Sequence, residues 1–146
     1  MIKALLDTNI FISCLLSPQI TGTIAQVVDA GIAGLYVPLL PGELLQEMFE
    51  AITRKEALSL RVKPEDMERL ASLLLHSGET IAPINEEIPD VSRDSKDNYL
   101  LAYAVIGEAD YLVTGDMDLL VLERVGQVQV VSPADFLAVL KKHQLF

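Results

Sequence analysis

Cysteine and histidine are scarce in this chain, and each shortage excludes a class of site. The single cysteine, Cys14, lies between apolar neighbours in FISCLLS, so it cannot form an internal disulfide or a metal site of several thiolates. We expect it to be a small core residue. The two histidines, His76 and His143, are not near the acidic motifs described below, which disfavours an imidazole metal site and favours ordinary surface positions.

Basic residues are also few. The chain has 11 lysines and arginines against 21 aspartates and glutamates, for a net charge of −10. Affinity for phosphate comes mostly from Lys and Arg, so this composition disfavours a broad nucleic-acid-binding face. Acidity also serves solubility alone. The distribution of the acids along the chain therefore decides what they mean.

Long apolar runs are absent as well, although 51% of the residues are hydrophobic. The longest, such as residues 32–40, contain Gly and Pro and fall short of the roughly 20 residues that span a membrane. The N-terminal MIKALLDTN reaches a charge too early for a signal peptide, so we expect a cytoplasmic protein. The length of 146 residues, without linker or repeat, predicts a single domain over 1–146.

Short apolar segments alternate with amphipathic ones along the chain. The apolar segments predict strands at 2–6, 35–38, 80–84, 110–114 and 127–131. The amphipathic segments predict helices at 8–17, 21–34, 41–58, 63–78, 98–107 (opened by Asp94 or Ser95), 119–126 and 134–143. Pro41 is expected in a first helical turn, and Ser132 with Pro133 as a cap and first turn. Alternating elements with few hairpin signals predict an α/β fold, a three-layer α/β/α sandwich with a mostly parallel central sheet.

Acidic residues follow two of these strands directly. Asp7 ends the first strand, and Asp116 and Asp118 follow the strand of ADYLVTGDMDLL. In open parallel sheets the functional site lies outside the carboxyl ends of the strands. If the two strands are neighbours, three carboxylates meet at one edge.

More acids lie on the predicted helices. Asp94 and Asp97 are three residues apart and share one face of a first turn, while Glu43 and Glu47 are four apart on another helix. Each acid taken alone also fits a turn, a helix cap or a solvated surface. Together, six of these acids can face one cleft, and that joint pattern is far more specific than its parts; the six are Asp7, Glu47, Asp94, Asp97, Asp116 and Asp118.

Clustered carboxylates favour a bound cation, because like charges packed together resist ionisation. Oxygen ligands suit Mg²⁺ or Mn²⁺ better than Zn²⁺. A carboxylate-held Mg²⁺ keeps positions open for water and phosphate oxygens, the arrangement that hydrolyses phosphodiesters. Asn9 and Thr114 are short polar residues placed to orient the carboxylates or a bound water, although turn chemistry explains them equally.

These motifs resemble the PIN-domain family, metal-dependent ribonucleases that include the VapC-type toxins of bacterial toxin–antitoxin pairs. The matching segments are, in the family's order, LLDTN, ELLQEM, DSKDNYLLAYAVIGEADYLVTGD, DMDLL and VVSPADFL. The resemblance implies a PIN-like fold and hydrolysis of single-stranded RNA by a metal-activated water, without a covalent intermediate. It also implies Mg²⁺ or Mn²⁺ as cofactor, a homodimer, and a small antitoxin protein as a partner.

The resemblance further implies a set of site residues. The catalytic acids are Asp7, Glu47, Asp97, Asp116 and, as a frequent fifth member, Asp118. Asp7, Asp97 and Asp116 are the implied metal ligands, and Asn9 and Thr114 match polar positions that line the family's site. Glu47 is preferred over Glu43 because the family's acid usually precedes an apolar residue in the middle of this helix, as Glu47 precedes Met48. Asp97 is preferred over Asp94, which becomes a supporting residue, because it directly opens NYLLAYA.

The scarcity of basic residues is where this chain departs from a nuclease. Arg93 and Lys96 flank the implied site and are placed to steer phosphate, although ordinary solvated charges explain them equally well. A loose basic group lies further back, at Arg54, Lys55, Arg61 and Lys63. A dimer would join two modest basic patches into one groove.

Three alternatives to a nuclease are each disfavoured by a feature of the sequence. A phosphatase with an aspartyl nucleophile needs a second acid two residues after the first, where this chain has Asn9, and a catalytic lysine that we cannot place. A phosphoacceptor receiver domain also needs a lysine on a late strand, which VQVVSP lacks. The third alternative is a catalytically inactive PIN-like module that binds a partner protein, against which the intact set of acids counts.

Overall fold

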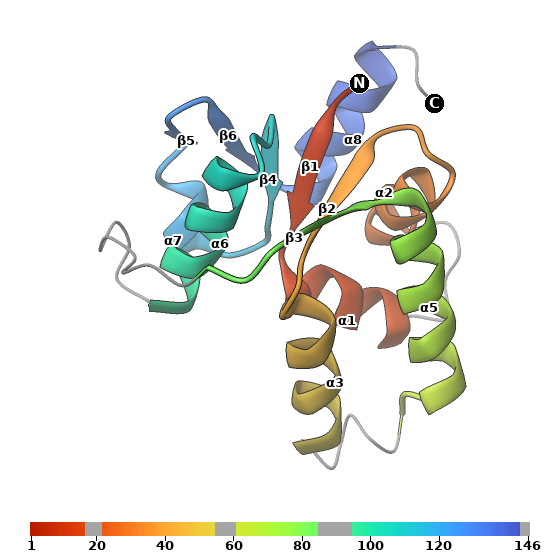
Figure 1. Cartoon of the computed structure of the whole chain (residues 1–146). Coiled ribbons are helices and arrows are strands. Elements are labelled where there is room, and N and C mark those ends of the chain that lie inside the picture. The colour runs from red at the N-terminus through yellow and green to blue at the C-terminus, as the bar shows by residue number, and fades with distance from the viewer. Residues whose placement is uncertain (17–21, 55–60, 85–94, 144–146) are drawn as a thin grey trace.

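The computed structural model describes residues 1–16, 22–54, 61–84 and 95–143, and the side chains of 95–97 lie outside this description. The strands are β1 (Lys3–Leu6), β2 (Val37–Pro41), β3 (Glu79–Ile81), β4 (Tyr111–Val113), β5 (Arg124–Val125) and β6 (Val128–Val131). The helices are α1 (Thr8–Leu16), α2 (Thr23–Ile32), α3 (Leu44–Arg54), α5 (Pro64–Ser77), α6 (Ser95–Ile106), α7 (Met117–Leu120) and α8 (Pro133–Lys142). Figure 1 shows how these elements are arranged.

The strands form one six-stranded sheet in the order β3-β2-β1-β4-β6-β5. Every pairing is parallel except that of β5 with β6. The predicted α/β fold with a mostly parallel sheet is therefore confirmed. β1 is central and pairs directly with β4, with Leu6 opposite Val113. The carboxyl ends of these two strands consequently lie side by side, which is the condition for their acids to meet.

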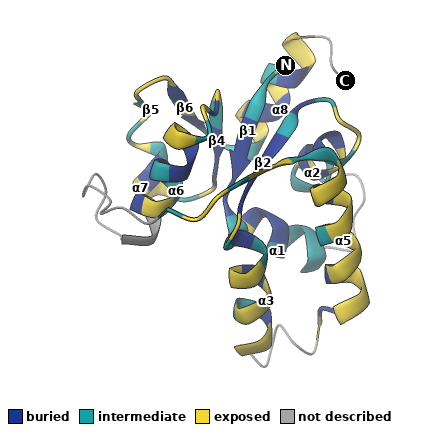
Figure 2. Ribbon diagram, in the orientation of Figure 1, coloured by how far each residue is buried: buried dark blue, intermediate teal, exposed yellow. Residues whose placement is uncertain are grey.

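Alternate residues of the central strands belong to two different apolar clusters. Ala4 and Leu6 of β1 pack into a cluster with α1, α2, α3, α5 and α8, whereas Leu5 packs into a second cluster with α6 and α7. This alternation places the sheet between two helical layers, as Figure 2 shows by the burial of its strands. The three-layer sandwich follows from it.

The predicted helix at 119–126 is wrong. A single turn of helix, α7, ends at Leu120, and Arg124–Val125 instead forms β5, antiparallel to β6. The two-residue turn that joins them begins with Gly126, whose φ of +60° suits glycine at the first position of a type II′ turn. Pairing across this hairpin outweighs the weak helical pattern of LLVLERV.

Pro41 also lies elsewhere than predicted, because it ends β2 and the helix begins three residues later at Leu44. Proline has no N–H to donate, so it is tolerated where the strand stops. The next donor, the N–H of Gly42, bonds the carbonyl of Ile81 at 2.9 Å and continues the contact with β3. Strand β2 is therefore longer at its carboxyl end than the apolar pattern indicated.

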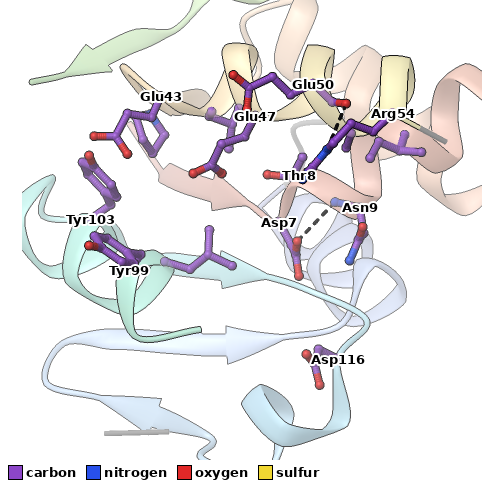
Figure 3. Close-up of a pocket in the computed structure, with 15 residues that line it drawn as sticks. Asp7, Thr8, Asn9, Glu43, Glu47, Glu50, Arg54, Tyr99, Tyr103 and Asp116 are labelled. Atoms are coloured by element: carbon purple, nitrogen blue, oxygen red, sulfur yellow. Dashed lines mark hydrogen bonds between the residues drawn. The ribbon is translucent and has the colours of Figure 1, made fainter. Parts of the chain in front are cut away.

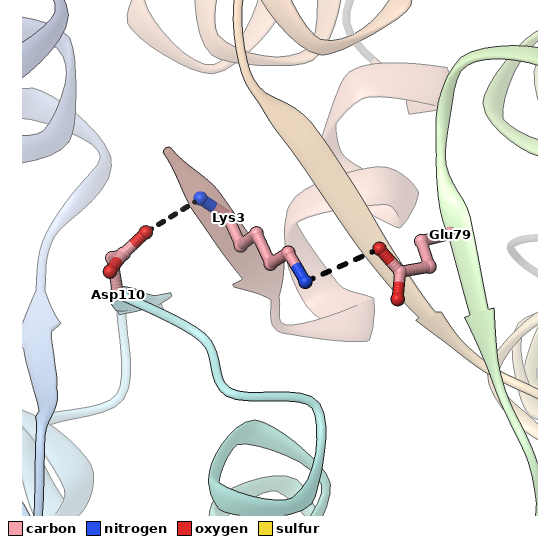
Figure 4. Close-up of polar contacts among 3 residues, drawn as sticks. All are labelled: Lys3, Glu79 and Asp110. Atoms are coloured by element: carbon pink, nitrogen blue, oxygen red, sulfur yellow. Dashed lines mark hydrogen bonds and ion pairs between the residues drawn. The ribbon is translucent and has the colours of Figure 1, made fainter. Parts of the chain in front are cut away.

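Lys3 ties three strands together at the opposite end of the sheet (Figure 4). Its backbone N–H donates to the Asp110 carboxylate at 2.9 Å, and the Asp110 N–H donates to the Lys3 carbonyl at 2.8 Å. Its ammonium lies 3.5 Å from Glu79 of β3 and so reaches across β2. This exposed ion pair adds little stability by itself, but it marks an end of the sheet where polar groups are neutralised within the fold.

Two smaller expectations are met. Ser132 caps α8 by accepting a hydrogen bond from the Asp135 N–H at 3.1 Å, with Pro133 in the first turn. Cys14 packs partly buried against the core, and burial, followed by the charge of Asp29, raises the pKa of its thiol.

Within the described part of the chain, no helix is long and apolar enough to cross a membrane.

Candidate acidic site at the carboxyl edge of the sheet

Asp7 is held at the carboxyl end of β1 by hydrogen bonds on both carboxylate oxygens. Its N–H continues the sheet by donating to the Val113 carbonyl at 2.9 Å, and its side chain is only 7% exposed. Oδ1 accepts from the Asn9 N–H at 3.2 Å, and Oδ2 accepts from the Thr114 hydroxyl at 2.8 Å. Asp7 therefore presents a nearly buried carboxylate in one fixed orientation.

Thr114 connects the two acidic segments. Its side chain is fully buried, and its N–H donates to the Val131 carbonyl at 2.9 Å, which fixes it at the end of β4. While the hydroxyl donates to Asp7, its oxygen accepts from the Asp116 N–H at 3.0 Å. One hydroxyl thus sets the position of Asp7 and of Asp116.

Asp116 begins the short helix α7 and caps it. Its Oδ1 accepts from the Asp118 N–H at 2.9 Å, and its partly exposed side chain lines the same cavity as Asp7. Asp118 is exposed in the first turn of α7 and does not line that cavity. The two aspartates of the GDMD sequence therefore occupy different positions. Asp116 faces the cavity, whereas Asp118 contacts the Asp116 side chain through its backbone N–H.

The cavity has a volume of about 550 Å³ and opens at the carboxyl edge of the sheet (Figure 3). Its walls come from the β1–α1 junction, from α3, from α6 and from Asp116. The lining residues are Asp7, Thr8, Asn9, Ile12, Pro41, Glu43, Leu44, Glu47, Glu50, Ala51, Arg54, Tyr99, Leu100, Tyr103 and Asp116. Three predicted site acids, Asp7, Glu47 and Asp116, are consequently brought to one cavity.

Glu43 and Glu47 both line the cavity, but Glu43 faces a tyrosine. Figure 3 shows its carboxylate beside Tyr103, whereas the Glu47 carboxylate lies between Glu43 and Asp7 in this view. Tyr103 is 3% exposed, and its hydroxyl oxygen accepts from the Ile84 N–H at 3.2 Å. Burial first, and then the carboxylates of Glu43 and Glu47, raise the pKa of Tyr103, while the Ile84 hydrogen bond opposes them. Tyr103 therefore stays neutral as a fixed part of the wall.

The remaining predicted residues lie at the start of α6. Arg93 and Asp94 fall outside the described residues. The backbones of Lys96 and Asp97 belong to the first turn of α6, whereas their side chains are not described. The same helix continues into the cavity wall with Tyr99.

The donor chemistry at the site fits a hard divalent cation. Within the described residues, which omit the Asp97 side chain, no three acidic, His or Cys side chains form a group able to hold a metal. The carboxylates of Asp7 and Asp116 supply oxygen atoms only, the ligand type that Mg²⁺ and Mn²⁺ prefer. A carboxylate has about four acceptor positions, and Asp7 uses two of them in hydrogen bonds, so capacity for a cation remains.

The lining includes four charged or aromatic residues that the sequence did not assign to the site, Glu50, Arg54, Tyr99 and Tyr103. Glu50 and Arg54 continue along α3 from Glu47, and the Arg54 Nε donates to the Glu50 carbonyl at 3.4 Å. Tyr99 and Tyr103 lie four residues apart on α6 and therefore share one face. Helical spacing from Glu47 and from Asp97 was the available signal, but it does not say which neighbours face the acids.

A protein-family model of the PIN domain matches residues 3–118. The chain belongs to the PIN-domain family. The match runs from β1 to α7 and so includes both aspartates of the cavity and all of α3 and α6. No curated protein and no solved structure was found to match. PIN domains are generally nucleases that use divalent metal ions, which is the class of chemistry that the donor set of this PIN domain fits.

Proposed function

We propose that this PIN domain is an Mg²⁺- or Mn²⁺-dependent ribonuclease that hydrolyses phosphodiester bonds of single-stranded RNA. The observation that carries the proposal is the joint placement of Asp7 and Asp116 by the Thr114 hydroxyl, in a cavity that Glu47 also lines. Such a pair of carboxylates at adjacent strand ends is costly without a compensating cation. Family membership supports the same chemistry.

In this proposal Asp7, Asp97 and Asp116 hold the metal ion. A bound divalent ion supplies Lewis-acid activation of water and neutralises charge on the phosphate. Asn9 and Thr114 hold the Asp7 carboxylate in the orientation needed for binding, and the Asp118 N–H holds that of Asp116.

Glu47 is the proposed acceptor for the proton of the attacking water. It lies in the first turn of α3, and its carboxylate lies between Glu43 and Asp7 in Figure 3. A carboxylate at this place can accept a proton from a water molecule. Asp118 completes the acidic set from the first turn of α7, where its backbone already fixes Asp116. Asp94 supports Asp97 from the preceding residues in the same proposal.

Phosphate contacts are assigned to the few basic groups near the cavity. Arg54 lines the wall formed by α3, and the proposal adds Lys96, in the first turn of α6, and Arg93, two residues before that helix in the sequence. A homodimer is part of the proposal, because a second copy would double these modest basic patches.

The proposed biological role is that of the toxin of a type II toxin–antitoxin pair, with a small antitoxin protein as partner. A neighbouring small gene whose product inhibits the cleavage would support that role.

The test is cleavage of a single-stranded RNA pool with Mg²⁺, with Mn²⁺ and with a chelator. The wild type is expected to cut only with metal. Asp7→Asn and Asp116→Asn each lower the rate by roughly 100-fold or more, the order of loss when a charge-stabilising group is removed from an active site. Glu68→Gln, an acid on the exposed face of α5, serves as the matched control and keeps full activity.

Absence of cleavage with either metal, or equal cleavage by the wild type and both variants, would overturn the nuclease proposal. The alternative of a catalytically inactive PIN-like module that binds a partner protein would then be favoured. Asparagine retains one oxygen that can accept from the Thr114 hydroxyl, so the Asp7 variant keeps a hydrogen bond of the fold.

A further inference from the structure

Tyr99 is an exposed aromatic ring on the wall of an acidic cavity. Its side chain is 50% exposed and lines the cavity from α6, one helical turn before the buried Tyr103. The other two tyrosines of the chain are used in the core, where Tyr36 and Tyr111 pack against the ring of Phe136. Among the described residues no ring packs against Tyr99, and half of its surface is available to a ligand.

The charge of the cavity limits how it can bind RNA. Five of its lining residues, Asp7, Asp116, Glu43, Glu47 and Glu50, are acidic, and Arg54 is basic. The whole chain has 21 acidic residues against 11 lysines and arginines. Attraction between phosphates and basic side chains, the usual main source of affinity for nucleic acid, is therefore weak here. A contact that does not depend on charge would therefore add affinity beyond what the metal ion and the few basic side chains supply.

Stacking of a base on an aromatic side chain is such a contact. It tolerates every base, since each has a flat face, and it does not weaken with salt as phosphate contacts do. A tyrosine on a helix is also well suited, because the ring has only two side-chain torsions to fix on binding. The α6 wall is anchored by Tyr103, whose hydroxyl accepts from Ile84.

We propose that Tyr99 stacks on a nucleobase of the RNA strand, next to the phosphodiester bond that lies over Asp7 and Asp116. The inference rests on the proposed ribonuclease function. In Figure 3, Tyr99 and Arg54 lie on opposite sides of Asp7. A strand that crosses the cavity past Asp7 thus meets an aromatic ring on one wall and a guanidinium on the other, so that Tyr99 contacts a base and Arg54 a phosphate.

The first test compares kcat and KM on short single-stranded RNA for three variants. Tyr99→Ala is expected to raise KM by about tenfold, which lies in the lower half of the range for loss of one base-stacking side chain. Tyr99→Phe keeps the ring and stays within about twofold of the wild type. Phe49→Ala is the matched control, because Phe49 is an aromatic residue of similar exposure (47%) on α3 that does not line the cavity.

The second test identifies the stacked base. Substrates that lack a single base, one position at a time, are cleaved by the wild type and by Tyr99→Ala. At the position that stacks on Tyr99, removal of the base weakens the wild type by about tenfold and has little further effect on the variant, since both changes delete the same contact. A role in folding alone would lower activity equally for every substrate.

The outcomes separate the two proposals. If the wild type cleaves RNA with metal and Tyr99→Ala matches it in KM, the stacking inference fails while the nuclease proposal stands. If the penalty of Tyr99→Ala persists unchanged at every base-free position, stacking is likewise excluded. If the wild type cleaves nothing and binds no RNA, both proposals fall together.

Discussion

At the scale of single residues, Thr114 has the most consequences for the site. Its hydroxyl donates to Asp7 and accepts from the Asp116 N–H, and the side chain has no exposed surface. A hydroxyl is the smallest group that can do both, since it is at once a donor and an acceptor. An apolar side chain of the same shape would remove the hydrogen bonds that Thr114 makes to Oδ2 of the nearly buried Asp7 and to the Asp116 N–H, while Oδ1 of Asp7 keeps the Asn9 N–H.

We therefore expect Thr114→Val to destabilise the fold by about 1–3 kcal/mol, the usual cost of leaving buried polar groups unpaired. Cleavage of RNA should fall as well, because Asp7 and Asp116 lose their shared support. Denaturant unfolding measures the first effect and single-turnover cleavage the second. Thr114→Ser keeps the hydroxyl and loses one buried methyl, so it should retain more activity than Thr114→Val. Equal activity of the two variants would contradict this role of the hydroxyl.

At the scale of elements, Tyr36 joins α2 to α8 at the start of β2. Its hydroxyl donates to the Val27 carbonyl at 2.7 Å, and its ring meets Phe136 edge-on with centroids 5.0 Å apart. Burial raises the pKa of Tyr36, so the hydroxyl remains a donor. Gly31 of α2 lies against this ring, and a Cβ built there would be 2.8 Å from the hydroxyl oxygen and 2.9 Å from the ring carbon that bears it.

Gly31→Ala should consequently destabilise the protein by about 1–3 kcal/mol through overpacking, although alanine is about 1 kcal/mol better than glycine in an open helix. Thermal and denaturant unfolding measure the loss. Gly22→Ser at the other end of α2 is the control, because a Cβ meets nothing there and serine adds a cap worth a few tenths of a kcal/mol. In a Tyr36→Leu background, which lacks both the hydroxyl oxygen and the ring carbon, the cost of Gly31→Ala should shrink, and an unchanged cost would contradict the proposed clash.

The elements that sequence patterns predicted well are those whose burial is uniform. β1 is central in the sheet, so both its faces are apolar and KALL predicts a strand by itself. β5 has only two residues, at the edge of the sheet. One exposed arginine followed by one partly exposed valine is too short to show the alternation of apolar and polar residues that predicts a strand. Its existence depends on the turn at Gly126 and on the partner strand, and these are tertiary facts rather than local ones.

At the scale of the whole molecule, acids at the two ends of the sheet have different surroundings. At the amino end Asp110 and Glu79 are paired with Lys3, whereas at the carboxyl end Asp7 and Asp116 share a cavity in which Arg54 is the basic residue among the described lining. The position of the carboxyl-end acids was predictable because strand ends are visible in the sequence. The facing walls were not predictable, because Arg54 and Tyr99 line one cavity only after α3 and α6 have packed around β1.

Because the carboxylates of Asp7 and Asp116 lie close together at one edge of the sheet, we expect a bound divalent metal ion to stabilise the whole fold. An ion that binds only the native state at 100 times its dissociation constant adds about 2.7 kcal/mol, which for a domain of this size raises Tm by roughly 5–10 °C. Thermal unfolding with increasing Mg²⁺ or Mn²⁺ measures the shift without any RNA. Asp7→Asn should abolish most of it, and Glu68→Gln, remote on α5, should preserve it. An equal shift in the wild type and in Asp7→Asn would place the ion elsewhere, and no shift with either metal would exclude a site of this strength at the carboxyl edge of the sheet.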